Sequence, residues 1–203
     1  MDWYEIDVTP SHDLDFAFLR EPLPEEVRAD RYKVLFGEGR FGDDYPEEPK
    51  VYMSKKDPGM KLGDFIGNTG NALVFSKRVK EVMHIDELNM PKMEFLPVWI
   101  HNHKRRLASK DYFICNVLET ADVLDKEVAK LNEVEGDVAS IEGLTFDERK
   151  ALKAPDLFRL KEEKDRYFAS SRLMYYITTM VVPPPTNIYV SQVAVSHKGE
   201  SET

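Results

Sequence analysis

The chain has 203 residues, of which 42% are hydrophobic and 32% charged, which is enough apolar material for one large domain with a buried core. Its formal net charge of −9 argues against nonspecific binding of nucleic acid, because phosphates attract Lys and Arg. A single cysteine excludes an internal disulfide framework, and no apolar run approaches the roughly 18–20 residues of a membrane span, so we expect a cytoplasmic protein that binds neither membrane nor nucleic acid.

The first 60 residues predict short elements separated by loops. Aromatic and β-branched residues at 3–8 predict a strand, and the acids after Pro24 favour a short helix. The glycines and prolines of 37–50 predict an exposed loop, and a strand at 51–54 follows. The acidic excess also lies here, since residues 1–50 hold 14 Asp and Glu against 6 Lys and Arg. It is either a solvated surface or a patch that steers a basic partner.

A strand–helix–strand unit begins near residue 70. Residues 71–75 predict a strand, Ser76 occupies an N-cap position, and apolar residues at helical spacing follow it. The unit ends with a strand at 93–102, where Pro97 favours an edge position or a bulge.

The middle of the chain predicts mainly strands. Residues 111–119 give the strongest strand pattern, and 122–131 predict a turn with a short helix. Strand character returns at 140–141, at 144–146 and at 155–160.

A second unit follows with the order of the first. A strand at 166–170 ends in a cap at Ser170, a helix covers 172–180, three prolines end it, and a strand follows at 187–195.

Alignment of Ser76 with Ser170 places Arg78 on Arg172, and we therefore predict a duplicated strand–Ser–helix–strand unit. Short helices beside mixed strands predict an α+β fold with a mixed or antiparallel sheet. The two arginines either pair with acids or face solvent, and the sequence does not decide between these positions.

We divide the chain into three regions. Residues 1–69 are expected to form an acidic region packed on the main domain, residues 70–195 the α+β domain, and residues 196–203 a disordered tail.

Each candidate for chemistry has a simpler structural interpretation. His101 and His103 share a strand face, but zinc takes three or four ligands, so we expect no metal. The glycines of 37–42 lead into acids that would repel phosphate, so we expect no cofactor. Cys115 lies between apolar residues as a buried thiol would. The serine caps lack a nucleophile elbow.

Asp122 and Asp125 are the remaining catalytic candidates. Paired carboxylates can perform acid–base chemistry, but they also cap turns by accepting hydrogen bonds from free backbone N–H groups. We expect no enzyme, and a small hydrolase or transferase that uses this pair is the alternative.

Several short motifs follow one another between about residues 70 and 180. Their positions are Ser76, Pro97, Tyr112, Asn116, Asp122, Asp125, Asp156, Phe158, Arg159, Ser170 and Arg172. In order and spacing these motifs resemble an immunity protein family of bacterial polymorphic toxin systems, family eleven, formerly a domain of unknown function. The resemblance implies an intracellular antidote that blocks a cognate toxin without catalytic or metal-binding residues.

These observations favour a protein that works by binding another protein. The expected partner is a toxin or effector with a basic surface, and the expected contacts are acids with aromatic anchors in the loop. A homo-oligomer joined through the helix 172–180 is a further alternative, and both monomer and homodimer stay open. The predicted contact residues are Glu38, Phe41, Asp43, Asp44, Tyr45, Glu47 and Glu48.

Overall fold

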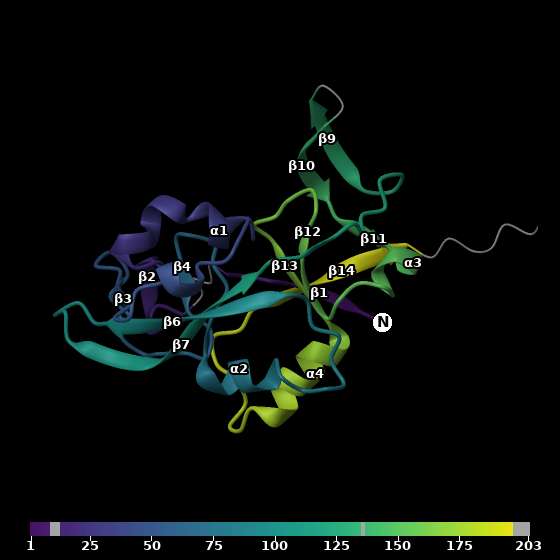
Figure 1. Ribbon diagram of the computed structural model, residues 1–203. Helices are drawn as coiled ribbons and strands as arrows, with labels where there is room; N and C mark the ends of the chain where they lie inside the picture. The colour runs from purple at the N-terminus through teal and green to yellow at the C-terminus, as the bar shows by residue number, and fades with distance from the viewer. Residues whose placement is uncertain (9–12, 135–136, 197–203) are drawn as a thin grey trace, which may run out of the picture.

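The computed structural model describes residues 1–8, 13–134 and 137–196, and the predicted tail beyond Ser196 lies outside these ranges. The fold is α+β, as predicted, with two six-stranded sheets, a separate two-stranded hairpin and a few short helices (Figure 1). The helices are η1 (Glu25–Asp30), α1 (Tyr32–Leu35), η2 (Gly42–Asp44), α2 (Lys77–Val82), α3 (Glu148–Ala151) and α4 (Ser171–Met180).

The first sheet has the strand order β4-β2-β3-β6-β7-β5. Its edges meet, because Phe65 bridges Phe75 and the Ile66 N–H donates to the Val74 carbonyl at 3.0 Å. The sheet is therefore a closed barrel. Its strands are β2 (Phe18–Glu21), β3 (Lys50–Met53), β4 (Gly67–Asn68), β5 (Val74–Ser76), β6 (Met93–His101) and β7 (Leu107–Val117).

The second sheet has the order β11-β14-β1-β13-β12-β8. It closes in the same way, because Leu124 bridges Phe146 and the Asp125 N–H donates to the Thr145 carbonyl at 2.9 Å. Its strands are β1 (Trp3–Ile6), β8 (Thr120–Ala121), β11 (Thr145–Asp147), β12 (Leu157–Leu160), β13 (Tyr167–Ser170) and β14 (Val190–Ser196). The hairpin β9 (Lys130–Val134) and β10 (Asp137–Gly143) projects from this half (Figure 1).

The two barrels share one topology. Taken around the ring, β3-β6-β7-β5-β4-β2 matches β11-β14-β1-β13-β12-β8, and each parallel or antiparallel pairing in one ring has its counterpart in the other. The duplication predicted from two short units thus extends to whole barrels. The last strand of the second copy, β1, comes from the opposite end of the chain, where the first copy uses β7.

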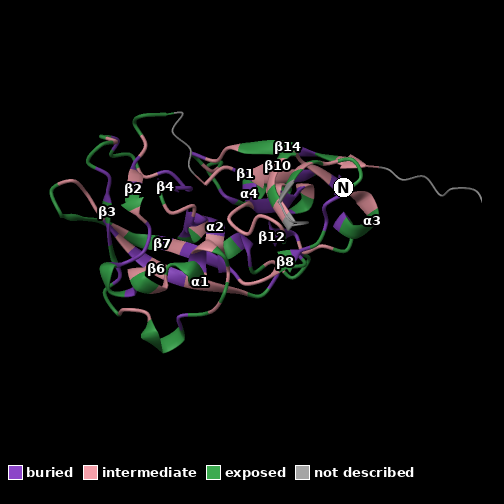
Figure 2. Cartoon of the chain, turned by 90° about the horizontal axis from the view of Figure 1, so that it is seen from above, coloured by how far each residue is buried: buried purple, intermediate pink, exposed green. Residues whose placement is uncertain are grey.

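Three hydrophobic clusters hold this arrangement together. One lies in the first barrel around residues such as Leu19 and Val98, and another in the second around Trp3 and Phe158. The third lies between the barrels, where Val79 of α2 and Leu173 of α4 pack against the sheets. α2 and α4 run side by side there (Figure 1), and buried residues gather along α2, β6 and β7 in the view from above (Figure 2).

Three local expectations can be compared with the structure. Pro97 lies in an interior strand, but pairing of β6 with β3 begins only at Trp99, and the register of β6 against β7 shifts between Val98 and Ile100, so the prediction of an edge or bulge holds locally. No helix forms over residues 122–131, because the Asp125 side chain accepts from the Glu127 N–H at 3.1 Å and turns the chain there. The Ser76 side chain makes no capping hydrogen bond, although Ser170 accepts one from the Leu173 N–H at 3.0 Å.

Candidate partner-binding surface

The loop of residues 37–50, which we call the acidic loop, is fixed against the first barrel by one carboxylate. Glu94, on β6, accepts hydrogen bonds from the N–H groups of Phe41 and Gly42 at 3.1 and 3.0 Å. Asn116, on β7, donates to Glu94 at 3.2 Å and to the Gly39 carbonyl at 2.9 Å. Backbone groups that would otherwise face solvent are thus held by side chains of two neighbouring strands, which gives the loop a defined shape.

The two aromatic residues of the loop support it from within. Phe41 is 3% exposed and packs in the core of the first barrel. The Tyr45 hydroxyl donates to the Pro97 carbonyl at 3.0 Å, and burial raises the pKa of this phenol, with the charges of Glu94 and Glu26 adding to the effect. The sequence predicted Phe41 as an aromatic contact residue for a partner, but its ring is buried and does not face solvent.

The acids of the loop differ in their surroundings. Glu48 pairs with Lys50 at 2.5 Å, and Glu38 pairs with Lys164 at 3.3 Å. The remaining three acids are exposed, and none of them forms an ion pair with another described residue. These three are Asp43, Asp44 and Glu47.

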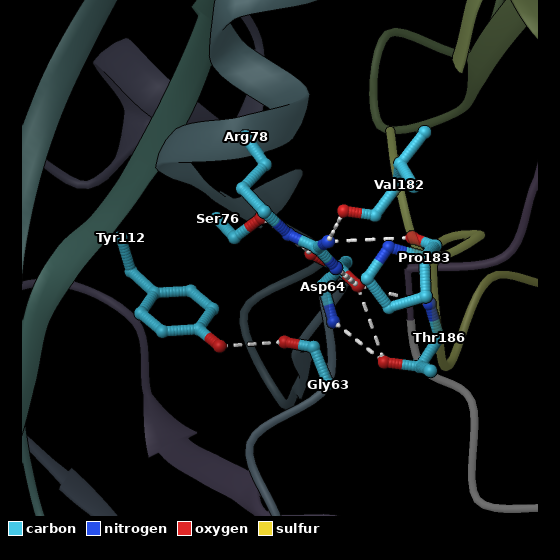
Figure 3. A network of polar contacts seen from close by, with 8 residues as sticks. All are labelled: Gly63, Asp64, Ser76, Arg78, Tyr112, Val182, Pro183 and Thr186. Carbon is cyan, nitrogen blue, oxygen red and sulfur yellow. Dashed lines mark hydrogen bonds and ion pairs between the residues drawn. The ribbon is translucent and has the colours of Figure 1, made fainter. Parts of the chain in front are cut away.

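Asp64, which precedes β4, organises the start of α2 (Figure 3). The Ser76 hydroxyl donates to its carboxylate at 2.7 Å, and Arg78 approaches it with Nε at 3.2 Å and Nη2 at 2.7 Å. The N–H of Thr186, which lies before β14, donates to the same carboxylate at 3.0 Å, and the Thr186 carbonyl accepts from the Asp64 N–H at 3.0 Å. Asp64 therefore joins the first barrel to a loop of the second half.

Asp156 repeats this arrangement at the start of α4. The Ser170 hydroxyl donates to its carboxylate, and Arg172 approaches with Nε at 3.1 Å and Nη2 at 2.5 Å. The Asn89 N–H donates to it at 2.7 Å, and the Asn89 carbonyl accepts from the Asp156 N–H at 2.7 Å. Asn89 precedes β6, so the second acid holds a loop of the first half. We call the two networks together the reciprocal clamp.

The sequence left open whether Arg78 and Arg172 pair with acids or face solvent. In the clamp both arginines pair with acids. The clamp also uses both serine hydroxyls as donors to carboxylates, which is a structural role. Asp156 belongs to the DLFR motif of the family resemblance, which gave it no role, and Asp64 was not among the predicted residues, although each precedes an apolar pair (DFI and DLF) and is followed at a similar distance by Ser-x-Arg.

Replacement of Asp64 with Asn tests the electrostatic part of the clamp. Burial alone would raise the pKa of Asp64, but hydrogen bonds from Ser76, Arg78 and the Thr186 N–H outweigh it and lower the pKa. A lowered pKa stabilises the fold above the unfolded value of about 3.9, and this contribution is lost as the pH falls further.

We therefore expect the loss of unfolding free energy in Asp64→Asn to be largest near pH 7 and to shrink below about pH 4. Urea unfolding at several pH values measures it, with Asp86→Asn as the exposed control. A loss that stays constant down to pH 2 contradicts this assignment.

The proposed carboxylate pair does not form one site. Asp122 is exposed and pairs with Lys150 and Lys161 at 3.2 and 3.3 Å. Partial burial would raise the pKa of Asp122, but the two lysines outweigh it and lower the pKa. Asp125 is instead buried and accepts from the Ser196 hydroxyl.

Other motif residues have structural positions. The Tyr112 hydroxyl donates to the Gly63 carbonyl at 2.7 Å (Figure 3), and the Phe158 ring stacks on Phe168 in the second barrel. Cys115 is fully buried, and burial raises the pKa of its thiol to about 12. Within the described ranges, no group of three or more His, Cys, Asp or Glu side chains is placed to hold a metal ion.

Arg159 is a buried cation that forms no ion pair with a carboxylate of the described residues. Its guanidinium donates to main-chain carbonyls and lies over the Tyr167 ring, 4.3 Å from the centroid. Two of the acceptors end the helix α1, one ends β7 and one follows β12, so this side chain joins three parts of the chain. The acceptors are the carbonyls of Val34, Leu35, Val117 (2.8 Å) and Lys164 (2.6 Å).

Residues 13–188 match the model of a family described as Immunity protein family (Imm11). The match includes both halves of the reciprocal clamp, the acidic loop and Arg159, and it suggests an immunity function. No curated protein matches the chain. In the parts of the chain that the structure describes, each helix is too short or too polar to span a bilayer.

Proposed function

Because the chain belongs to the Immunity protein family (Imm11), we propose that it binds a cognate bacterial toxin or effector and neutralises it by covering a surface that the toxin needs. The proposal includes a cytoplasmic encounter and an antidote without catalytic activity of its own. The catalytic candidates of the sequence support this second part, since Cys115 is a buried thiol and Asp122 and Asp125 lie in separate surroundings.

We assign the acidic loop as the contact with the toxin. The assignment is supported by the hydrogen bonds that fix the loop backbone to Glu94. Asp43, Asp44 and Glu47 are exposed without ion-pair partners among the described residues. Glu94 of β6 holds the backbone just before them, at Phe41 and Gly42. An acidic surface that is already ordered loses little conformational freedom on binding, and its field attracts a basic partner. We infer that the toxin presents Lys and Arg to this loop.

Charge reversal of these three acids tests the loop. The partner to be tested is a toxin domain sought in the reading frames next to that of this chain, and its affinity is measured by calorimetry at two salt concentrations. We expect Asp43→Lys/Asp44→Lys/Glu47→Lys to bind at least about 30-fold more weakly, since each reversal replaces attraction by repulsion.

The matched control reverses three exposed acids near the end of α2, as Glu81→Lys/Asp86→Lys/Glu87→Lys, and is expected to bind nearly as the unmodified chain does. Equal affinity and salt dependence of both variants would remove the loop from the interface. Failure of the unmodified chain to bind the toxin or to protect cells from it would overturn the proposed function itself.

A further inference from the structure

The outer face of β6 carries aromatic residues. Along this strand Leu96, Val98 and Ile100 are buried in the first barrel, while the intervening side chains are only half-buried. Two of the half-buried residues are Phe95 and Trp99. Because successive side chains of a strand point to opposite faces, both rings lie outside the first barrel, where Phe95 packs against the cluster between the barrels.

Cations lie over the rings of this face. Lys110 Nζ is 3.4 Å from the centroid of Trp99, and Lys80 Nζ is 4.1 Å from that of Phe113 and 5.2 Å from that of Phe95. At the end of β3, the Arg105 guanidinium carbon is 5.8 Å from the centroid of Tyr52. We call this surface the basic–aromatic face, made up of Tyr52, Trp99 and Phe113 with Lys80, Arg105 and Lys110.

The turn between β6 and β7 holds part of this charge in place. The Asn102 side chain accepts from the N–H groups of Lys104 and Arg106 at 2.9 and 3.1 Å. Arg105 has a φ of 58°, a left-handed conformation that is uncommon for a residue with a side chain. The turn is therefore shaped by specific contacts, and it presents three consecutive exposed cations.

None of these cations lies within ion-pair distance of a carboxylate in the described part of the chain. Lys80, Arg105, Arg106 and Lys110 form no ion pair with a described carboxylate, whereas Lys50 nearby pairs with Glu48. A patch of unpaired positive charge on a chain with a net charge of −9 is a local reversal of sign. Arg and Trp are also the residue types that most often dominate the energy of protein interfaces.

We propose that the basic–aromatic face docks an acidic segment of a partner protein. The inference rests on the proposed function and deepens it, because it assigns an acidic stretch as well as a basic one to the toxin. Carboxylates of the segment would meet Lys110 and Arg105, and its apolar side chains would cover the rings beside them.

The position of the acidic loop favours a short protein segment over nucleic acid. Lys50, which pairs with Glu48, lies beside Trp99 in the strand register, and the loop therefore borders the face. A hydrogen bond from Lys50 is the main reason that the pKa of Glu48 lies below its usual value, and the charge of Lys110 adds to it. An extended polyanion would run from the face into these acids, whereas a protein segment can end before them.

Trp99 provides a direct test. The chain has two tryptophans, and Trp3 is 1% exposed, so the two indole N–H resonances compare the face with the core in a ¹⁵N-labelled sample. The probe is a dodecapeptide of alternating Glu and Leu, with a Lys–Leu peptide and a single-stranded DNA dodecamer as comparisons. We expect the Glu–Leu peptide to shift the Trp99 resonance saturably and to leave that of Trp3 unchanged.

Charge reversal then locates the contact. Arg105→Glu/Lys110→Glu is expected to weaken binding of the Glu–Leu peptide at least tenfold, while Arg149→Glu/Lys153→Glu, which reverses two exposed cations at α3, leaves it unchanged. Circular dichroism verifies that both variants are folded. An unmoved Trp99, equal binding by the two variants, or tighter binding of the DNA at equal salt each overturns the proposal. Because no toxin is present, the result is independent of whether the proposed function holds.

Discussion

Deletion of residues 1–8 is expected to abolish cooperative folding of the second barrel. β1 is an interior strand that pairs with β13 on one side and β14 on the other. Its Trp3 is 1% exposed and contacts the rings of Phe146 and Phe158 at 6.5 and 5.2 Å between centroids. Loss of a buried Trp side chain alone costs about 3–5 kcal/mol, a large share of the typical 5–15 kcal/mol of a whole domain, and here two strand pairings are lost as well.

A permuted chain separates the loss of the strand from a loss of chain length. Trp3 pairs with Val193 and Ile6 with Val190, so the start of β1 lies beside the end of β14. In the first barrel the equivalent strands are joined directly, as the hairpin of β6 and β7. We expect a chain that starts at Asp13 and carries residues 1–8 after Ser196, joined by a short glycine-containing turn, to fold.

The measurement is thermal unfolding followed by near-ultraviolet circular dichroism, which reports the packing of aromatic side chains. The deletion variant should lose the cooperative transition of the second barrel, and the permuted chain should recover it. A deletion variant that unfolds like the full chain would show that β1 is dispensable, and a permuted chain that stays unfolded would show that the matched topology of the two barrels is not interchangeable.

Arg159→Met is expected to lower the free energy of unfolding by about 3–5 kcal/mol. Replacement of a whole buried ion pair by apolar residues is often neutral, since both charges leave together. Here the partners are main-chain carbonyls that remain in place, and each buried carbonyl left without a donor costs about 1–3 kcal/mol. The affected groups include the carbonyls of Val34 and Leu35, which end α1.

Urea unfolding measures this effect, and Arg149→Met on the exposed surface is the matched control, with an expected change within about 0.5 kcal/mol. Arg159→Lys should recover only part of the loss, because an ammonium is shorter and has three donors in place of a planar fork. A loss below about 1 kcal/mol for Arg159→Met would show that water or a shifted backbone replaces the guanidinium.

The sequence predicted well those features that depend on neighbouring residues. Ser170 has a local cap signal, and the strand and helix around it alternate with the expected periods, so the second unit was found with nearly its observed bounds. The aligned arginines indicated the duplication. The position of Asp64 and the role of Asp156 were not predicted, because their partners lie more than ten residues away and the short DFI and DLF patterns alone do not indicate a carboxylate network.

The pairing of strands far apart in the chain could not be predicted from the sequence either. Nothing in residues 3–6 indicates that they complete a barrel whose other strands follow residue 119. Phe41 was predicted as an aromatic anchor because it lies among acids in a loop. Its ring is instead buried in the first barrel, by residues that are distant in the sequence. The three-region division and the contact residues of the loop stay predictions.

Ring closure limits how this molecule can be recognised. An open sheet offers a row of free N–H and C=O groups, onto which a foreign peptide can add as a further strand. At the two ring closures, Phe65 with Phe75 and Leu124 with Phe146, these groups are used internally. A ligand that binds at either closure must therefore recognise side chains, so its selectivity depends on residue identity, and point substitutions can redirect it while the backbone stays as it is.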